Sequence, residues 1–166
     1  MNRYNTIIKN DVVNGKGVCV SFWVQGCPHH CEDCFNPETW DFNSGKLYTE
    51  ETKKEIIEAI SANNIKRNFS VLGGEPLAGK NIEMTKDIVK SVRETYPDIK
   101  IFLWTGYDFE DSSQDMDFFE ILNYIDVVID GKFIKELKNL NLKLRGSSNQ
   151  RIWVKNKEGF WKVQND

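Results

Sequence analysis

Three cysteines lie close together in the chain with the spacing Cys27-x3-Cys31-x2-Cys34, and a fourth, Cys19, precedes them. In a reducing cytosol, clustered thiols are more often metal ligands or redox groups than a disulfide framework. Cysteine sulfur is the ligand that holds iron–sulfur cubanes. Three thiolates on one tight loop would therefore hold a four-iron cluster and leave one iron open to a substrate or cofactor. Cys19 lies in an alternating strand pattern and is interpreted as a buried small hydrophobe.

A structural zinc site is the alternative interpretation of the same segment, with His29 or His30 as the fourth ligand. Structural zinc loops usually contain two C-x2-C-like pairs that are separated in sequence, and this chain has no second pair. Each histidine also stands between two cysteines, where it would strain to share their metal. We therefore favour an iron–sulfur cluster over zinc, and both over accidental clustering.

A glycine-rich turn, Gly73-Gly74-Glu75-Pro76, follows a predicted strand over residues 69–72. Residues 74–80 nearly match the phosphate-binding pattern G-x-x-x-x-G-K-[ST], and residues 127–130 resemble the strand that holds magnesium in nucleotide hydrolases. A P-loop nucleotide hydrolase is thus an alternative from another class of protein. Two features count against it: Asn81 replaces the metal-binding hydroxyl, and the proline of the turn removes a backbone N–H.

Strands and helices alternate along the chain, and both motifs directly follow strands. The predicted strands cover residues 17–24, 69–72, 99–104 and 126–129, and the predicted helices cover 50–62, 81–95 and 115–123. This alternation predicts parallel strands joined by right-handed crossovers. The polar segment 25–47 holds the cysteines and is expected to be a long loop, which in a compact domain indicates a function.

The number of predicted strands limits the fold. Four of them are too few to close an eight-stranded barrel, so we expect an α/β fold that forms an open, partial barrel. Residues 1–166 are expected to form a single domain, since no repeat or linker divides them. Residues 151–163 predict a terminal hairpin, and the lysine-rich stretch 132–143 predicts a solvated helix face.

Charge and composition exclude several classes of partner. The chain of 166 residues has 22 basic and 25 acidic side chains, a net charge of -3, which offers no electrostatic footprint for nucleic acid or an anionic membrane. Residues 1–6 lack the apolar stretch of a signal peptide, and no apolar run reaches the ~20 residues of a membrane span. We therefore expect a cytoplasmic protein.

The two motifs together resemble those of a known superfamily. Cys27-x3-Cys31-x2-Cys34 followed by Gly73-Gly74-Glu75-Pro76 is similar to the radical S-adenosylmethionine (SAM) superfamily. The closer resemblance is to its glycyl-radical activases, in the family that activates anaerobic ribonucleoside-triphosphate reductase. It rests on residues 26–42, 104–107, 126–133 and 145–152. The likeness runs from about residue 15 to residue 152.

The resemblance implies a fold, cofactors and site residues. The fold would be a partial, open β/α (TIM-like) barrel of the radical SAM type. Cys27, Cys31 and Cys34 would hold one [4Fe–4S] cluster per chain, and no catalytic residue is expected beyond the cofactors. Gly73, Gly74 and Glu75 would bind S-adenosyl-L-methionine, with Glu75 accepting its ammonium group. Asp33, Cys34 and Phe35 would also contact this cofactor. Many enzymes of the superfamily have an aromatic residue just before the third cysteine, where it borders the adenine; this chain has Asp33 there, which could serve only through its backbone.

The implied activity is that of an oxidoreductase of the [formate-C-acetyltransferase]-activating type. Such an enzyme reductively cleaves SAM to a 5′-deoxyadenosyl radical and generates a glycyl radical, here on the large subunit of anaerobic ribonucleotide reductase. The alternative is the activase of another glycyl-radical enzyme, such as pyruvate formate-lyase. The electron donor would be flavodoxin-like or ferredoxin-like. The related activase of pyruvate formate-lyase holds a cation at comparable strand ends. In this chain, the resemblance implies Asp130 as the one candidate ligand for such a cation. The alternative interpretation is that Asp130-Gly131 simply forms a turn.

Overall fold

Eight strands form one mixed sheet in the structure, a computed structural model that describes residues 2–164. The strand order is β3-β1-β2-β4-β5-β6-β7-β8. The four central strands are β2 (Cys19–Val24), β4 (Asn68–Gly73), β5 (Ile101–Trp104) and β6 (Val127–Asp130). They pair in parallel, which confirms the prediction from the alternating strands and helices.

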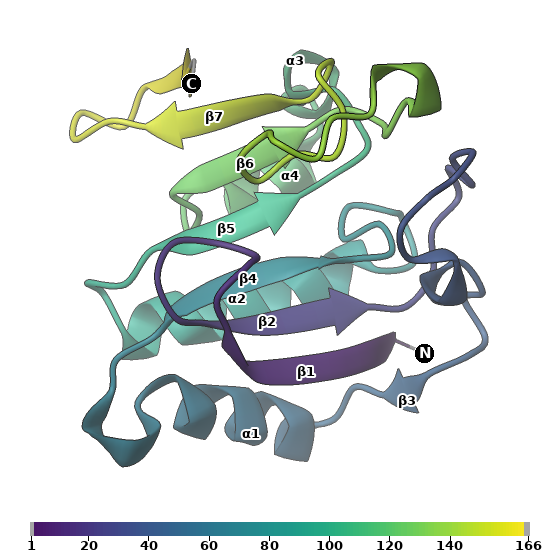
Figure 1. Ribbon diagram of the computed structural model, residues 1–166. Helices are drawn as coiled ribbons and strands as arrows, with labels where there is room; N and C mark the ends of the chain where they lie inside the picture. The colour runs from purple at the N-terminus through teal and green to yellow at the C-terminus, as the bar shows by residue number, and fades with distance from the viewer. Residues whose placement is uncertain (1, 165–166) are drawn as a thin grey trace.

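Antiparallel strands flank this parallel centre on both sides (Figure 1). On one side, β1 (Arg3–Asp11) pairs with both β2 and β3 (Lys46–Leu47). On the other side, β7 (Arg151–Lys155) and β8 (Trp161–Gln164) form the predicted terminal hairpin, and β7 pairs with β6. The sequence pattern does not predict β1, because most of its residues are half-buried or exposed and do not alternate cleanly.

The helices α1 (Glu50–Ile60), α2 (Ile82–Thr95) and α4 (Met116–Ile121) each lie within a predicted helix. Thr49 caps α1, since its hydroxyl accepts a hydrogen bond from the Thr52 N–H. The remaining helical segments of residues 2–164 are α3 (Phe109–Ser112) and short 3-10 turns at Pro37–Thr39, Ala62–Asn64 and Lys135–Leu137. Over the same residues, no helix is long and apolar enough to cross a membrane.

The main hydrophobic core lies between these helices and one face of the sheet. Its buried side chains include Phe22 and Phe69 from the strands, Ile88 from α2 and Phe118 from α4. Figure 1 shows α2 and α4 behind the strands. Burial of apolar surface stabilises the fold by about 25 cal/mol per Å². This face therefore supplies the rigid support for the loops at the strand ends.

The opposite face of the sheet carries a smaller apolar cluster, and a loop covers part of it. The cluster consists of Phe102, Val127, Ile129 and Ile152. The β1–β2 loop (residues 12–18) lies over this face, where the Ser70 hydroxyl donates a hydrogen bond to the Asn14 carbonyl at 2.6 Å. A Cβ atom at Gly15 would lie 2.5 Å from Cys19 Sγ. Cys19 is fully buried under this loop, which confirms its interpretation as a packing residue.

The helix predicted for residues 132–143 is wrong. The segment contains only the 3-10 turn Lys135–Leu137. Its backbone instead pairs with the segment before β7: the Ile134 N–H donates to Ser147 Oγ at 3.1 Å, and the Ser148 N–H donates to the Leu137 carbonyl at 2.9 Å. These tertiary hydrogen bonds override the helix propensity of the lysine-rich stretch, because intrinsic propensity is small compared with tertiary contacts.

Candidate metal-cluster site

The ends of the four parallel strands surround a cavity of about 390 Å³. The predicted site residues in its wall are Cys27, Cys31, Cys34, Phe35, Gly73, Gly74 and Glu75. Asp33 does not line the cavity. Its carboxylate lies 3.6 Å from the Lys135 ammonium, and its backbone has a positive φ of 59°. The structure thus brings together every predicted site residue except Asp33.

The loop that carries the cysteines is held in shape by its own hydrogen bonds. The Cys27 N–H donates to the Trp40 carbonyl at 3.1 Å, and the Cys34 N–H donates to the Cys31 carbonyl at 3.1 Å. The rings of His30 and Trp40 stack, with centroids 4.5 Å apart and planes at 7°. Trp40 therefore fixes the loop through both its backbone and its ring, a role that sequence reasoning missed.

The three thiols fit an iron–sulfur cluster. All three cysteines are free and half-buried, and they face one cavity. Burial raises the pKa of the Cys27 thiol to about 11 and also raises the pKa of Cys31. These thiols are therefore protonated at neutral pH, and an incoming metal must displace protons from them. In a four-iron cluster each thiolate binds a different iron, so the sulfurs need not converge on one point.

The zinc alternative gains no support from the geometry. Within residues 2–164, no group of three or more His, Cys, Asp or Glu side chains is placed to hold a single metal ion. His29 Nε2 lies 2.7 Å from Glu75 Oε1, and the His30 ring stacks on Trp40. Both histidines that could serve as the fourth zinc ligand are thus in contact with other side chains.

Gly73 and Gly74 allow the ends of β2 and β4 to approach closely. Gly73 has a φ of +106°, and a Cβ atom there would lie 2.9 Å from the Val24 backbone nitrogen. A Cβ atom at Gly74 would overlap the Gly26 carbonyl oxygen. Close packing of the backbone therefore requires glycine at both positions, in addition to the close approach to a ligand that the sequence predicts.

Both carboxylate oxygens of Glu75, in the cavity wall, have hydrogen-bond partners, and the residue is only 1% exposed. Its Oε1 accepts a hydrogen bond from the Gly106 N–H at 2.6 Å and faces His29. Its Oε2 accepts from the Thr105 hydroxyl at 2.8 Å and from the Leu77 N–H at 2.9 Å. A buried carboxylate needs such partners. A ligand ammonium at Oε1 would therefore share this oxygen with His29 or replace it.

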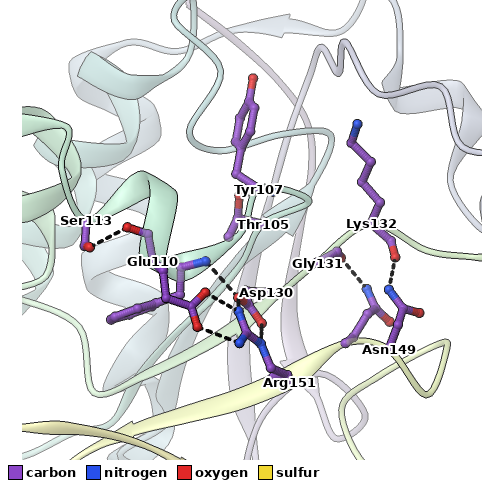
Figure 2. A network of polar contacts seen from close by, with 11 residues as sticks. Thr105, Tyr107, Glu110, Ser113, Asp130, Gly131, Lys132, Asn149 and Arg151 are labelled. Carbon is purple, nitrogen blue, oxygen red and sulfur yellow. Dashed lines mark hydrogen bonds and ion pairs between the residues drawn. The ribbon is translucent and has the colours of Figure 1, made fainter.

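Asp130 ends β6 on the same edge of the sheet, and a side chain already fills the position expected for a cation. The Arg151 guanidinium donates to Asp130 Oδ2 at 2.6 Å and to Oδ1 at 3.1 Å (Figure 2). The Phe109 N–H also donates to Oδ2, at 2.8 Å. Sequence reasoning missed Arg151, because its position depends on the antiparallel register that pairs it with Asp130.

A second cavity of about 1070 Å³ adjoins the first. The two cavities share Gly106, Gly131 and Lys132 in their walls. Glu110 and Arg151 line the second cavity, as do the carboxylates of the α3–α4 segment. The cysteine-lined cavity thus opens beside a space large enough for a polypeptide segment.

Comparisons with known proteins identify the family. A family model described as a 4Fe-4S single cluster domain matches residues 13–153. The anaerobic ribonucleoside-triphosphate reductase-activating protein of Enterobacteria phage T4 is 43% identical to the chain, over 96% of the chain and 97% of that protein. Proteins of the same name from Vibrio cholerae and Escherichia coli (strain K12) are 40% and 36% identical, each over 90% of the chain and 96% of their length. The chain belongs to this activating-protein family.

Membership of the activating-protein family agrees with the geometry of the glycine-rich turn, which does not form a phosphate cradle. The turn's own N–H groups donate internally: Gly74 to the Val24 carbonyl, Glu75 to the Gly26 carbonyl and Ala78 to the Glu75 carbonyl. A P-loop needs such amides free to face phosphate oxygens. Both the family and the hydrogen bonds therefore count against the P-loop alternative.

Proposed function

We propose that the chain is a radical SAM activase that generates the glycyl radical on the large subunit of anaerobic ribonucleoside-triphosphate reductase. The observation that carries the proposal is the convergence of Cys27, Cys31, Cys34 and Glu75 on one cavity, in a chain of the activating-protein family. The proposed reaction class is that of the [formate-C-acetyltransferase]-activating enzymes, with a different protein substrate.

In this proposal the three thiolates hold a [4Fe–4S] cluster, and Gly73, Gly74 and Glu75 bind SAM beside it. A cluster held there would supply the electron for reductive cleavage of the sulfonium–C5′ bond of SAM, and the resulting 5′-deoxyadenosyl group would take the α-hydrogen of the target glycine. Glu75 orients the ammonium group of SAM through Oε1, the oxygen that His29 now faces. The Phe35 ring, which lines the cavity, borders the adenine.

The proposal extends to the fold and the partners. Four parallel strands with the cavity at their carboxyl ends support a partial, open β/α (TIM-like) barrel, in which ligands bind at that edge. The adjoining cavity supports a protein substrate, because it offers room for a glycine-bearing segment next to the cysteines. A flavodoxin-like or ferredoxin-like protein supplies the electron, and the four free thiols suit the reducing cytosol.

The test is to reconstitute the chain with iron and sulfide without oxygen, reduce it, and add SAM and the large reductase subunit. We expect a glycyl doublet in the electron paramagnetic resonance spectrum, together with 5′-deoxyadenosine and nucleotide reduction. Cys31→Ala should lose the iron and the doublet. Cys19→Ala is the matched control, because it removes a thiol outside the cavity, and it should keep both.

Three outcomes would contradict parts of the proposal. A strong doublet on pyruvate formate-lyase and none on the reductase would overturn the partner and leave the radical chemistry standing. Iron loss in Cys19→Ala with iron retained in Cys31→Ala would overturn the ligand set. The absence of 5′-deoxyadenosine with either partner would overturn the proposed function.

A further inference from the structure

Arg151 bridges two carboxylates at the strand end next to the candidate site (Figure 2). Its two terminal nitrogens lie 2.6 Å from the two carboxylate oxygens of Glu110, a bidentate contact. The same guanidinium contacts both oxygens of Asp130. Bidentate guanidinium–carboxylate pairs fix geometry as well as charge. Arg151 therefore ties the first turn of α3 to the end of β6.

The Asp130 side chain needs this partner because it is only 1% exposed. A buried carboxylate is costly unless it is paired and hydrogen-bonded. Arg151 and the Phe109 N–H supply every donor that the structure shows for the Asp130 carboxylate. The guanidinium thus lies beside Asp130, where the family resemblance implies a bound cation.

The segment that Arg151 holds leads directly to Glu75. Residues 105–110 run from the end of β5 to α3, and at one end the Thr105 hydroxyl and the Gly106 N–H donate to the Glu75 carboxylate. At the other end, the Phe109 N–H donates to Asp130. The Tyr107 ring packs edge-on against His29 between these two ends, with centroids 4.6 Å apart. The segment is therefore anchored at both ends by buried carboxylates.

Aromatic stacking strengthens the anchor at the Asp130 end. The guanidinium carbon of Arg151 lies 4.9 Å from the centroid of the Trp153 ring. The Phe109 ring stacks on the same indole, with centroids 4.3 Å apart and planes at 12°. Phe109 is thus fixed through both its amide and its ring by groups that Arg151 contacts. Removal of the guanidinium would loosen Phe109 and the segment before it.

We propose that Arg151 is a positioning residue: a built-in cation that holds residues 105–110 in place, and through them sets the Glu75 carboxylate for SAM. The part of this inference that concerns SAM rests on the proposed function. The part that concerns the segment is a property of the chain alone.

The chain offers a matched control at the opposite end of the same strand. Arg93 pairs with Asp126, which directly precedes β6, and it donates to the carbonyls of Tyr124 and Ile99. This is also an arginine–aspartate pair next to β6, but it lies before the amino end of the strand, and neither residue lines the cavity. Loss of Arg93 should weaken the fold without affecting the segment 105–110 in particular.

The test compares Arg151→Ala, Arg151→Lys and Arg93→Ala by amide hydrogen exchange of the metal-free chain. In Arg151→Ala we expect residues 105–110 to exchange at least about tenfold faster, while α1 and α2 keep their wild-type rates. Arg151→Lys should restore part of the protection, because it keeps the charge and loses the bidentate contact. Arg93→Ala should raise exchange broadly rather than in this segment.

The second readout is the split between KM and kcat in SAM cleavage by the reconstituted chain. Arg151→Ala should raise the KM for SAM about tenfold and leave kcat within about twofold, because a misplaced Glu75 weakens binding. Wild-type exchange and a wild-type KM in Arg151→Ala would overturn the proposal, as would faster exchange spread equally over the helices. If the wild-type chain itself cleaves no SAM, the proposed function fails, and the exchange data still decide the role of Arg151.

Discussion

The two faces of the sheet are built on different principles. The face covered by α1, α2 and α4 contains large apolar side chains that are fully buried, such as Phe22, Phe69 and Ile88. The edge and face around the cavity contain glycines, half-buried thiols and buried carboxylates, such as Glu75 and Asp130. Non-directional packing stabilises the first region, whereas specific hydrogen bonds and ion pairs hold the second.

This difference predicts how each region responds to change. The helix-covered face should tolerate exchange among apolar side chains of similar volume and respond to the loss of volume. The cavity region should respond to the loss of single polar atoms, through weaker ligand binding and through a local loss of order around the buried carboxylates. Substitutions in the helix-covered face should therefore change mainly the free energy of unfolding, and substitutions in the cavity region should change mainly ligand binding.

The largest effect on stability is expected from Phe69→Ala, which removes a fully buried ring from the helix-covered face. The expected loss is about 3–5 kcal/mol in the free energy of unfolding, measured by urea titration of the metal-free chain. Phe119→Ala is the matched control, because Phe119 is 66% exposed and should change stability by less than about 0.5 kcal/mol. A loss below about 1 kcal/mol for Phe69→Ala would break the comparison between the faces.

The next effect concerns ligand binding rather than folding. Glu75→Gln should weaken SAM binding by about 10- to 150-fold, because a charged hydrogen bond contributes roughly 1.5–3 kcal/mol. Titration of the reconstituted chain, followed by the cluster's electron paramagnetic resonance signal, measures this. Lys80→Ala should change nothing, since the Lys80 ammonium lies over the Phe42 ring, 5.3 Å from its centroid. The reverse pattern, together with ATP binding, would favour the P-loop alternative.

The smallest effect is a pH dependence at the edge of the cavity region. The hydrogen bond from Arg151 lowers the pKa of Glu110 below its ordinary value of 4.5, against a small opposing effect of burial. The Glu110 contribution to stability is therefore complete above about pH 4.5 and is lost as the pH falls through the lowered pKa. Because Glu110 is solvent-exposed, this contribution is at most about 1 kcal/mol.

The measurement is the difference in unfolding free energy between the wild type and Glu110→Gln, followed from pH 7 to pH 3. That difference should shrink towards acid pH. A difference that grows on acidification would contradict the assigned sign.

The sequence predicts the parts of both regions that depend on local spacing. Cys27, Cys31 and Cys34 reach one cavity as their spacing indicates, and the apolar periodicity places α1 and α2 correctly. In both cases the information lies within one segment of the chain. The Glu75 position also follows from a local motif, the glycine-rich turn.

The contacts that the sequence does not predict join residues that are far apart in the chain. Arg151 meets Asp130 only through the register of β6 and β7, and His29 meets Glu75 across 46 positions. No local pattern predicts either contact. The wrong prediction of a helix over residues 132–143 has the same cause, because hydrogen bonds to residues 146–148 determine the conformation of this segment.

The residues of the cavity wall are spread along most of the chain, which affects when the wall can form during synthesis. The wall draws on residues from Val13 to Gln150, so it exists only when nearly the whole chain has been synthesised. The three thiols leave the ribosome long before their partners in the wall do, because synthesis proceeds from the amino terminus. The complete wall, and with it a fully formed site for iron, therefore exists only after nearly the whole chain has left the ribosome.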